Sequence, residues 1–171
     1  PYHAGIQDMS LDFFSDVDIL LCCVDNDWAR YITNLLWLEQ EKALPLVDGS
    51  MGADFISIRL LQNKNGPCLT CSWTDEYKQE VLSHQVQQEC REFVQDTVED
   101  IPMVSFINSF AGAVMTQEAV KFQLGQLRQH NPSEKENPDP PLLDIHTGLS
   151  VGEYFRFRLD TLESTRGRIQ T

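Results

Sequence analysis

Two short groups of residues carry side chains that could do chemistry. Asp25 and Asn26 follow directly on the apolar run Val17–Val24, and Cys68 and Cys71 form a C-x-x-C motif after a Gly-Pro turn. A carboxylate at the carboxyl end of a buried strand can bind a magnesium ion that bridges nucleotide phosphates. Asp and Asn are also common helix N-caps, so the local sequence leaves both interpretations of this pair open.

Zinc is the metal that the C-x-x-C motif favours, because two thiolates at this spacing can bind one ion. A structural zinc site needs four ligands, and the nearest further candidates are His84 and Cys90. On one regular helix these two side chains would be rotated by about 240° relative to each other, so they would not converge. Two of four ligands are weak evidence for zinc, so the residues alone leave a zinc site open, and a redox role is less favoured because no helix obviously begins at the motif.

Cys90 is the third candidate, on the apolar face of a predicted helix. A single cysteine in that setting is usually a small core residue. A nucleophile needs thiolate character and solvent access, and the only nearby sources of positive charge are His84 and Arg91. The residues alone therefore favour a core position for Cys90.

Composition narrows the class of protein. The 171 residues are 42% apolar and carry a formal net charge of −13, which predicts one acidic globular domain. Such a charge repels phosphate backbones, so we expect no nucleic-acid partner and interpret the four arginines after Tyr154 as a solvated tail. The longest apolar run, Ile19–Val24, falls far short of the ~20 residues that cross a bilayer, which argues against a membrane protein. Five cysteines, two of them adjacent within an apolar run, favour a reducing cytoplasmic location.

The first candidate pair is positioned by a strand, a helix and a second strand. Val17–Val24 is typical of a strand buried on both faces of a parallel sheet. Apolar residues at helical spacing then continue to about Lys42, and Pro45–Asp48 predicts the second strand. Residues 17–48 therefore predict a doubly wound unit, with an exit turn at Gly49–Gly52 and a further strand at Phe55–Leu61.

The second half of the chain is predicted to contain two helices and a closing pair of strands. A polar helix is expected over Lys78–Val98, and a largely buried helix over Val104–Gly125, whose apolar residues form a broad stripe. Residues 131–141 hold four prolines and predict a loop, before strands at Leu142–His146 and Val151–Arg158.

These elements predict a single, partial domain. It divides into a strand-helix-strand core, the C-x-x-C and crossover segment, the buried helix, the proline-rich loop, and the closing strands with a tail, at residues 1–62, 63–100, 101–130, 131–141 and 142–171. The chain begins at Pro1 without a methionine, so we expect a fragment of a longer protein.

Four signals in order resemble the ThiF/MoeB and ubiquitin-activating-enzyme superfamily over about residues 6–158. They are a strand ending in Asp-Asn with an arginine following, a Pro-Leu-Val strand, the C-x-x-C motif, and a helix ending in Glu-Ala-Val-Lys, at Val17–Asn34, Leu44–Gly49, Pro67–Cys71 and Ala111–Lys121. The resemblance implies an α/β fold, a Rossmann-like ThiF-type mixed sheet with flanking helices. This chain would be its C-terminal half.

Members of that superfamily activate the C-terminal glycine of a ubiquitin-like or sulfur-carrier protein by forming an acyl-adenylate from ATP. The resemblance implies that Asp25, Asn26 and Arg30 serve the magnesium-nucleotide site. It also implies that Cys68 and Cys71 contribute to a structural zinc site, and makes Cys90 the only candidate for an acceptor thiol. ATP, magnesium and zinc are the implied cofactors, and a homo- or heterodimer that binds the carrier is the implied assembly.

The sequence departs from the superfamily pattern in three places, one of which is the long acidic segment Lys78–Asp100. None of its nine glycines forms a Gly-x-Gly-x-x-Gly loop, and no cysteine follows Arg158 to supply a second C-x-x-C. The chain alone is therefore not expected to make an adenylate. The alternatives are a non-catalytic partner subunit or pseudoenzyme scaffold for dimerisation and carrier binding, and a zinc-dependent binding module.

Overall fold

The computed structural model describes residues 5–51, 55–63, 66–89, 105–130, 149, 151–158 and 160–169. Five strands in these segments form one mixed sheet in chain order: β1 (Leu20–Cys22), β2 (Pro45–Met51), β3 (Phe55–Gln62), β4 (Glu153–Arg158) and β5 (Ser164–Arg168). β1 runs parallel to β2, and every later neighbour is antiparallel. The predicted α/β class with a mixed sheet is confirmed.

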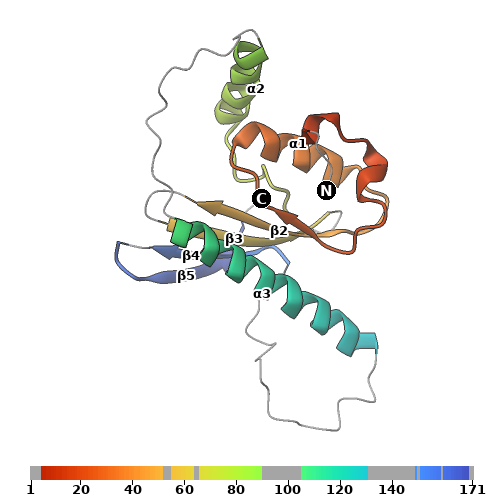
Figure 1. Cartoon of the computed structure of the whole chain (residues 1–171), viewed down its shortest axis with the longest axis vertical. Helices are drawn as coiled ribbons and strands as arrows, with labels where there is room; N and C mark the ends of the chain where they lie inside the picture. Colours follow the sequence, from red (N-terminus) through yellow and green to blue (C-terminus); the bar gives the residue numbers. More distant parts are fainter. Residues whose placement is uncertain are drawn as a thin grey trace.

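Helices cover both faces of this sheet (Figure 1). α1 (Asp27–Leu38) and α2 (Asp75–Glu89) lie on one side, and α3 (Ser105–His130) crosses the other. Two short 3-10 helices, η1 (Ile6–Asp8) and η2 (Leu11–Phe14), precede β1. The three predicted helices are present with shifted ends, and the end of the predicted Lys78–Val98 helix lies outside the described residues.

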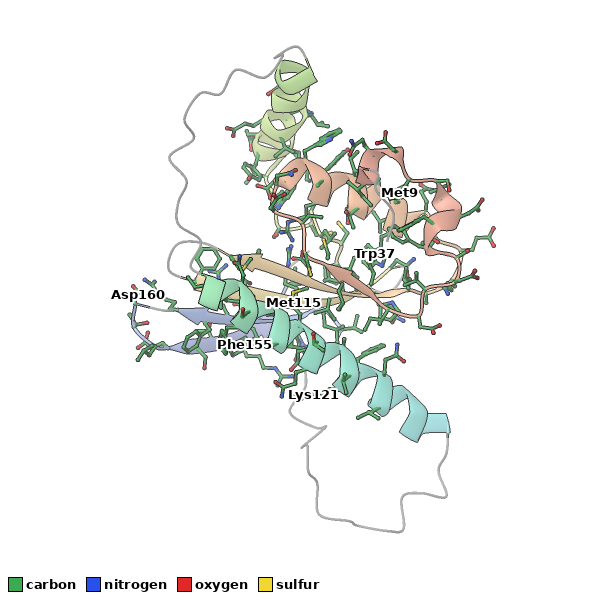
Figure 2. The ribbon with its side chains drawn as sticks, viewed as in Figure 1. Met9, Trp37, Met115, Lys121, Phe155 and Asp160 are labelled. Carbon is green, nitrogen blue, oxygen red and sulfur yellow. The ribbon has the colours of Figure 1, made fainter. Side chains whose placement is uncertain are left out.

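The pleat of the strands separates two kinds of side chain. Alternate residues of β3, Ile56, Ile58 and Leu60, are fully buried in a cluster with α3. Met115 of α3 and Phe155 of β4 both point into this layer (Figure 2). Gly49 of β2 permits the close approach, because a Cβ atom there would overlap the Met115 Sδ atom. One face of the sheet is therefore an apolar core.

A second apolar cluster covers one end of the opposite face. Trp37 of α1 is fully buried there with Leu46 and Leu61 (Figure 2), and its Nε1 donates a hydrogen bond of 2.7 Å to the Leu44 carbonyl. The buried Asn63 side chain joins the loop after α1 to the end of β3, since its Oδ1 accepts from the Leu44 amide and its Nδ2 donates to the Trp37 carbonyl. These bonds set the position of α1 above the sheet.

Two expectations about the first strands are corrected. β1 is shorter than Val17–Val24, and Leu21 is 40% exposed, so this strand is not buried on both faces. The reason is its place at the sheet edge, with β2 as its one strand neighbour in the described structure. The exit turn predicted to begin at Gly49 is also wrong in part, because β2 continues pairing with β3 through Met51.

The C-terminal end of the chain differs more from the sequence-based expectation than the first strands do. The arginines predicted to form a solvated tail belong to a hairpin, in which β5 pairs with β4 and Arg166 makes an ion pair of 2.5 Å with Glu153. β4 begins at Glu153, since Val151 and Gly152 form the preceding turn, and its second partner is β3. The predicted strand at 142–146 and the loop at 131–141 lie outside the described residues.

α3 is buried along one stripe only, which narrows the expectation of a largely buried helix. Its innermost residues are Ile107, Ala111, Met115 and Ala119, whereas Val120 and Leu124 are 46% and 37% exposed. Among the described residues, every helix falls short of the combined length and apolar character that crossing a bilayer requires.

Candidate functional site

A cleft of about 670 Å³ opens at the carboxyl ends of the parallel strands β1 and β2. Its walls come from the start of α1, the strands β2 to β5 and the C-x-x-C loop. Among the described residues, Asp27 is the one carboxylate that lines it, and four arginines do so: Arg30, Arg59, Arg156 and Arg168. Open α/β sheets bind ligands at this edge. The lining charges indicate an anionic ligand.

The carboxylate of Asp48 orients two of these arginines. Its side chain is fully buried on β2, where it makes ion pairs with Arg30 of α1 and with Arg59, its cross-strand neighbour on β3. The Arg59 Nε and Nη2 atoms lie 2.9 Å and 2.5 Å from Asp48 Oδ2. Burial lowers the pKa of both guanidinium groups, yet arginine stays protonated in proteins. The network therefore presents two oriented cations to the cleft.

Further donors of these arginines bind backbone carbonyls. Arg30 Nη2 donates to the Val24 and Gly49 carbonyls, at 3.3 Å each, and Arg59 Nη1 donates to the Leu69 carbonyl at 3.1 Å. Three chain segments are thereby tied to one buried carboxylate. A satisfied network of this kind is rigid, and removal of its centre leaves buried charges without a partner.

α1 turns a largely polar stripe toward the sheet. Its buried residues are Arg30, Thr33, Asn34 and Trp37. Asn34 Oδ1 accepts a hydrogen bond of 2.9 Å from the Leu69 amide, and its Nδ2 donates to the Thr70 hydroxyl. The same helix therefore positions Arg30 and the C-x-x-C loop.

The predicted nucleotide residues separate in the structure. Arg30 lines the cleft, whereas Asp25 and Asn26 are exposed and are not among its lining residues. Asn26 is the N-cap of α1, since its Oδ1 accepts a hydrogen bond of 2.8 Å from the Ala29 amide, and its Nδ2 donates to Asp25 at 3.0 Å. The capping interpretation of Asn26 is confirmed.

Cys68 and Cys71 lie with their Sγ atoms 2.7 Å apart, and Cys71 lines the cleft. Burial raises the pKa of the Cys68 thiol, but hydrogen bonds from Cys71 and Thr70 outweigh it and hold that pKa below its usual range. Burial and the bond with Cys68 raise the pKa of the Cys71 thiol.

A zinc ion fits this pair only in part. In the described part of the chain, no third Cys, His, Asp or Glu joins the two thiols in a metal-binding group. The two thiols have the donor chemistry that zinc favours, and two further ligands would be needed. The predicted acceptor, Cys90, lies outside the described residues.

The rim of the cleft is tied to α2. Tyr77 donates a hydrogen bond to Asp27, and this bond raises the pKa of Tyr77 to about 12. The Tyr77 ring packs edge to face on Trp73, with centroids 5.3 Å apart. Asp27 also lies 3.7 Å from Arg30 Nε, so this lining carboxylate already has two partners.

Sequence reasoning missed the centre of this site. Asp48 closes the strand Pro45–Asp48 that the apolar pattern predicts, and Arg59 stands in the next predicted strand. The signal that could have identified them is a charged residue of opposite sign in each of two buried strands, because buried charges are paired.

Comparison with known proteins shows the fold. No family model and no curated protein matches the chain. The solved structure of E. coli MccB matches with a TM-score of 0.51 and 14% identity, over 94% of this chain and 39% of MccB. The structure of MccB with succinimide matches with a TM-score of 0.50 and 13% identity, over 93% of this chain and 40% of MccB. A weaker match is the structure of PaaA, with a TM-score of 0.47 and 17% identity, over 93% of this chain and 44% of PaaA.

The chain therefore spans less than half the length of these proteins. At such low identity the likeness to MccB establishes the fold alone, a mixed α/β sheet of Rossmann-like type.

Proposed function

We propose that this chain is part of an ATP-dependent activating protein of the ThiF type. Such a protein adenylates the C-terminus of a ubiquitin-like or sulfur-carrier protein. One observation carries the proposal: Arg30 is held at the carboxyl edge of the parallel β1-α1-β2 unit and lines an arginine-rich cleft. The order of the four sequence signals supports it, and the fold shared with MccB is compatible with it.

The residues of this chain act through position and charge. Arg30 and Arg59, oriented by Asp48, stabilise negative charge in the cleft without reorganising. Asp25 lies just beyond the end of β1, outside the lining of the cleft, and its exposed carboxylate, which accepts a hydrogen bond from Asn26, is the group we assign to magnesium. When bound, magnesium-ATP supplies the α-phosphorus that the carrier carboxylate attacks as pyrophosphate leaves. The Gly-rich loop that the sequence lacks must come from a further segment or subunit.

Three further parts complete the proposal. Cys90 is the acceptor thiol for the activated acyl group. Cys68 and Cys71 bind zinc together with ligands from elsewhere. The protein works as a homo- or heterodimer that binds the carrier.

The Asp25→Ala substitution in the complete protein tests the adenylation step. ATP-pyrophosphate exchange with the carrier should fall by about 100-fold, the scale of losing one electrostatic contact to the reacting groups. Urea unfolding should be unchanged because Asp25 is exposed. Asp18→Ala, an exposed carboxylate at the other end of β1, is the matched control and should retain exchange. Full exchange in Asp25→Ala removes Asp25 from the site.

The same assay separates the role of Cys90. Cys90→Ala should spare exchange but abolish a thioester with the carrier, detected as a band that a thiol reductant removes. A thioester that persists would return Cys90 to a structural role.

A non-catalytic partner subunit or pseudoenzyme is the second candidate. The observation that favours it is the lack of a Gly-x-Gly-x-x-Gly pattern among the nine glycines. For this candidate, the complete protein binds the carrier but shows no exchange, with or without magnesium.

A further inference from the structure

The cleft is locally basic in a strongly acidic chain. The protein carries a formal charge of −13, yet four arginines line this cavity. They come from α1, β3, β4 and β5, so only the fold brings them together. Acidic surroundings disfavour anions elsewhere on the molecule, and a low-dielectric cleft focuses the field of its cations.

Arg156 differs from the other three. Arg30 and Arg59 share Asp48, and the Arg168 Nε atom lies 3.9 Å from Glu153. Arg156 makes no ion pair with the described residues, and its guanidinium lies 5.0 Å from the centroid of the Phe55 ring. Stacking on an aromatic ring orients the guanidinium while leaving its donors available. Within the described part of the cleft, Arg156 is therefore the cation that has no carboxylate partner.

The hydroxyl groups of Ser50 and Ser57 lie in the same cross-strand row as Arg156. Ser50 of β2 pairs with Ser57 of β3, and Ser57 pairs with Arg156 of β4, so the three residues share one face of the sheet. All three line the cleft. The next row on this face is Asp48, Arg59 and Tyr154. Hydroxyl and guanidinium donors beside a buried ion-pair network match what an oxyanion requires.

We propose that this row is an oxyanion-binding subsite, in which Arg156 binds the anion and Ser50 and Ser57 donate hydrogen bonds. The inference rests on the proposed function, in which two groups share this chemistry. They are the C-terminal carboxylate of the carrier and a phosphate of the nucleotide. Arg156 is the docking cation for one of them.

Calorimetric binding to the full chain at low salt tests the subsite directly. The probes are a short peptide with a free C-terminal carboxylate, the same peptide amidated at its C-terminus, and pyrophosphate. At least one anionic probe should bind, more weakly as salt rises because Arg156 is exposed. Arg156→Gln should weaken that binding about tenfold, the loss of one charge-assisted contact.

Arg158→Gln is the matched control. It removes the same charge from the same strand, but Arg158 pairs with Asp160 and is not a lining residue of the cleft. Binding should be unchanged in this variant. Ser57→Ala should weaken binding a few-fold and provides a second variant with the charge intact. Circular dichroism of each variant checks that the fold is retained.

The outcomes identify the source of the anion. Binding of the free peptide but not the amidated one assigns the subsite to the C-terminal carboxylate, and binding of pyrophosphate alone assigns it to a phosphate. No binding of either anion, or equal weakening in Arg156→Gln and Arg158→Gln, overturns the proposal. The measurement involves no turnover, so intact anion binding in a protein without exchange would remove the proposed function and leave the subsite.

Discussion

The two faces of the sheet are built from the same strands but serve different purposes. On the α3 face, Ile56 and Ile58 are buried against an apolar helix stripe, and burial of their surface stabilises the fold. On the other face, the alternating residues Ser57 and Arg59 line a cleft above the buried Asp48. Burying charges costs desolvation energy, so under the cleft this face is held together by ion pairs, while the apolar cluster around Trp37 covers its other end. Both faces contribute to stability, and only the second combines it with charged groups that could bind a ligand.

Removal of the Asp48 carboxylate should give the largest effect. Asp48→Ala leaves Arg59 buried without a counter-ion and Arg30 with only its longer contact to Asp27, which we expect to cost about 3–5 kcal/mol in the free energy of unfolding. Urea denaturation followed by circular dichroism measures this loss. Ser50→Ala, two residues along the same face, is the control and should cost about 1 kcal/mol or less. Equal stability of Asp48→Ala and the parent chain would contradict the ion-pair network.

Added side-chain volume on the apolar face of the sheet should lower the free energy of unfolding. Gly49→Ala introduces a Cβ atom that overlaps Met115 Sδ, and overpacking of this kind costs about 1–3 kcal/mol. Because the clash is with one side chain, the double variant with Met115→Ala should lose less stability than the two single losses combined. The free energies of unfolding of the four proteins complete this cycle. Additive losses would show that the cost of Gly49→Ala does not come from contact with Met115.

The smallest effect concerns pH at the rim of the cleft. The hydrogen bond to Asp27 raises the pKa of Tyr77 from its ordinary 10 to about 12, so the folded state favours the protonated phenol. The stabilisation is complete below about pH 10 and is lost as pH rises from there toward 12. Absorbance titration should show one tyrosine with this delayed ionisation, and Asp27→Asn should return it toward 10. An unshifted profile in the parent protein would rule out the bond.

Local pattern was sufficient to predict the main elements. The apolar run before Asp25, the capping residue Asn26 and the strand at Pro45–Asp48 predicted the parallel β1-α1-β2 unit, because period and caps are local properties. The hairpin at β5 was missed because Ser164–Arg168 has no apolar alternation and takes its strand form from pairing with β4.

The site was harder to predict than the elements. Asp48 is separated from Arg30 by 18 residues and from Arg59 by 11, so no local window contains the network. The C-x-x-C motif was visible, but its contact with α1 depends on the side chain of Asn34, which is 35 residues from Leu69. Spacing therefore indicated which residues could act, and packing showed which of them meet.

By itself, the sequence determined the α/β class, the order of the first elements and the presence of cysteines and carboxylates at their ends. These follow from backbone periodicity and side-chain chemistry, which act between near neighbours along the chain. Only the tertiary structure decided that four arginines gather in one cleft of an acidic protein. Electrostatic energy depends on distance in space and on burial, and neither quantity exists until the strands pair and α1 packs on the sheet.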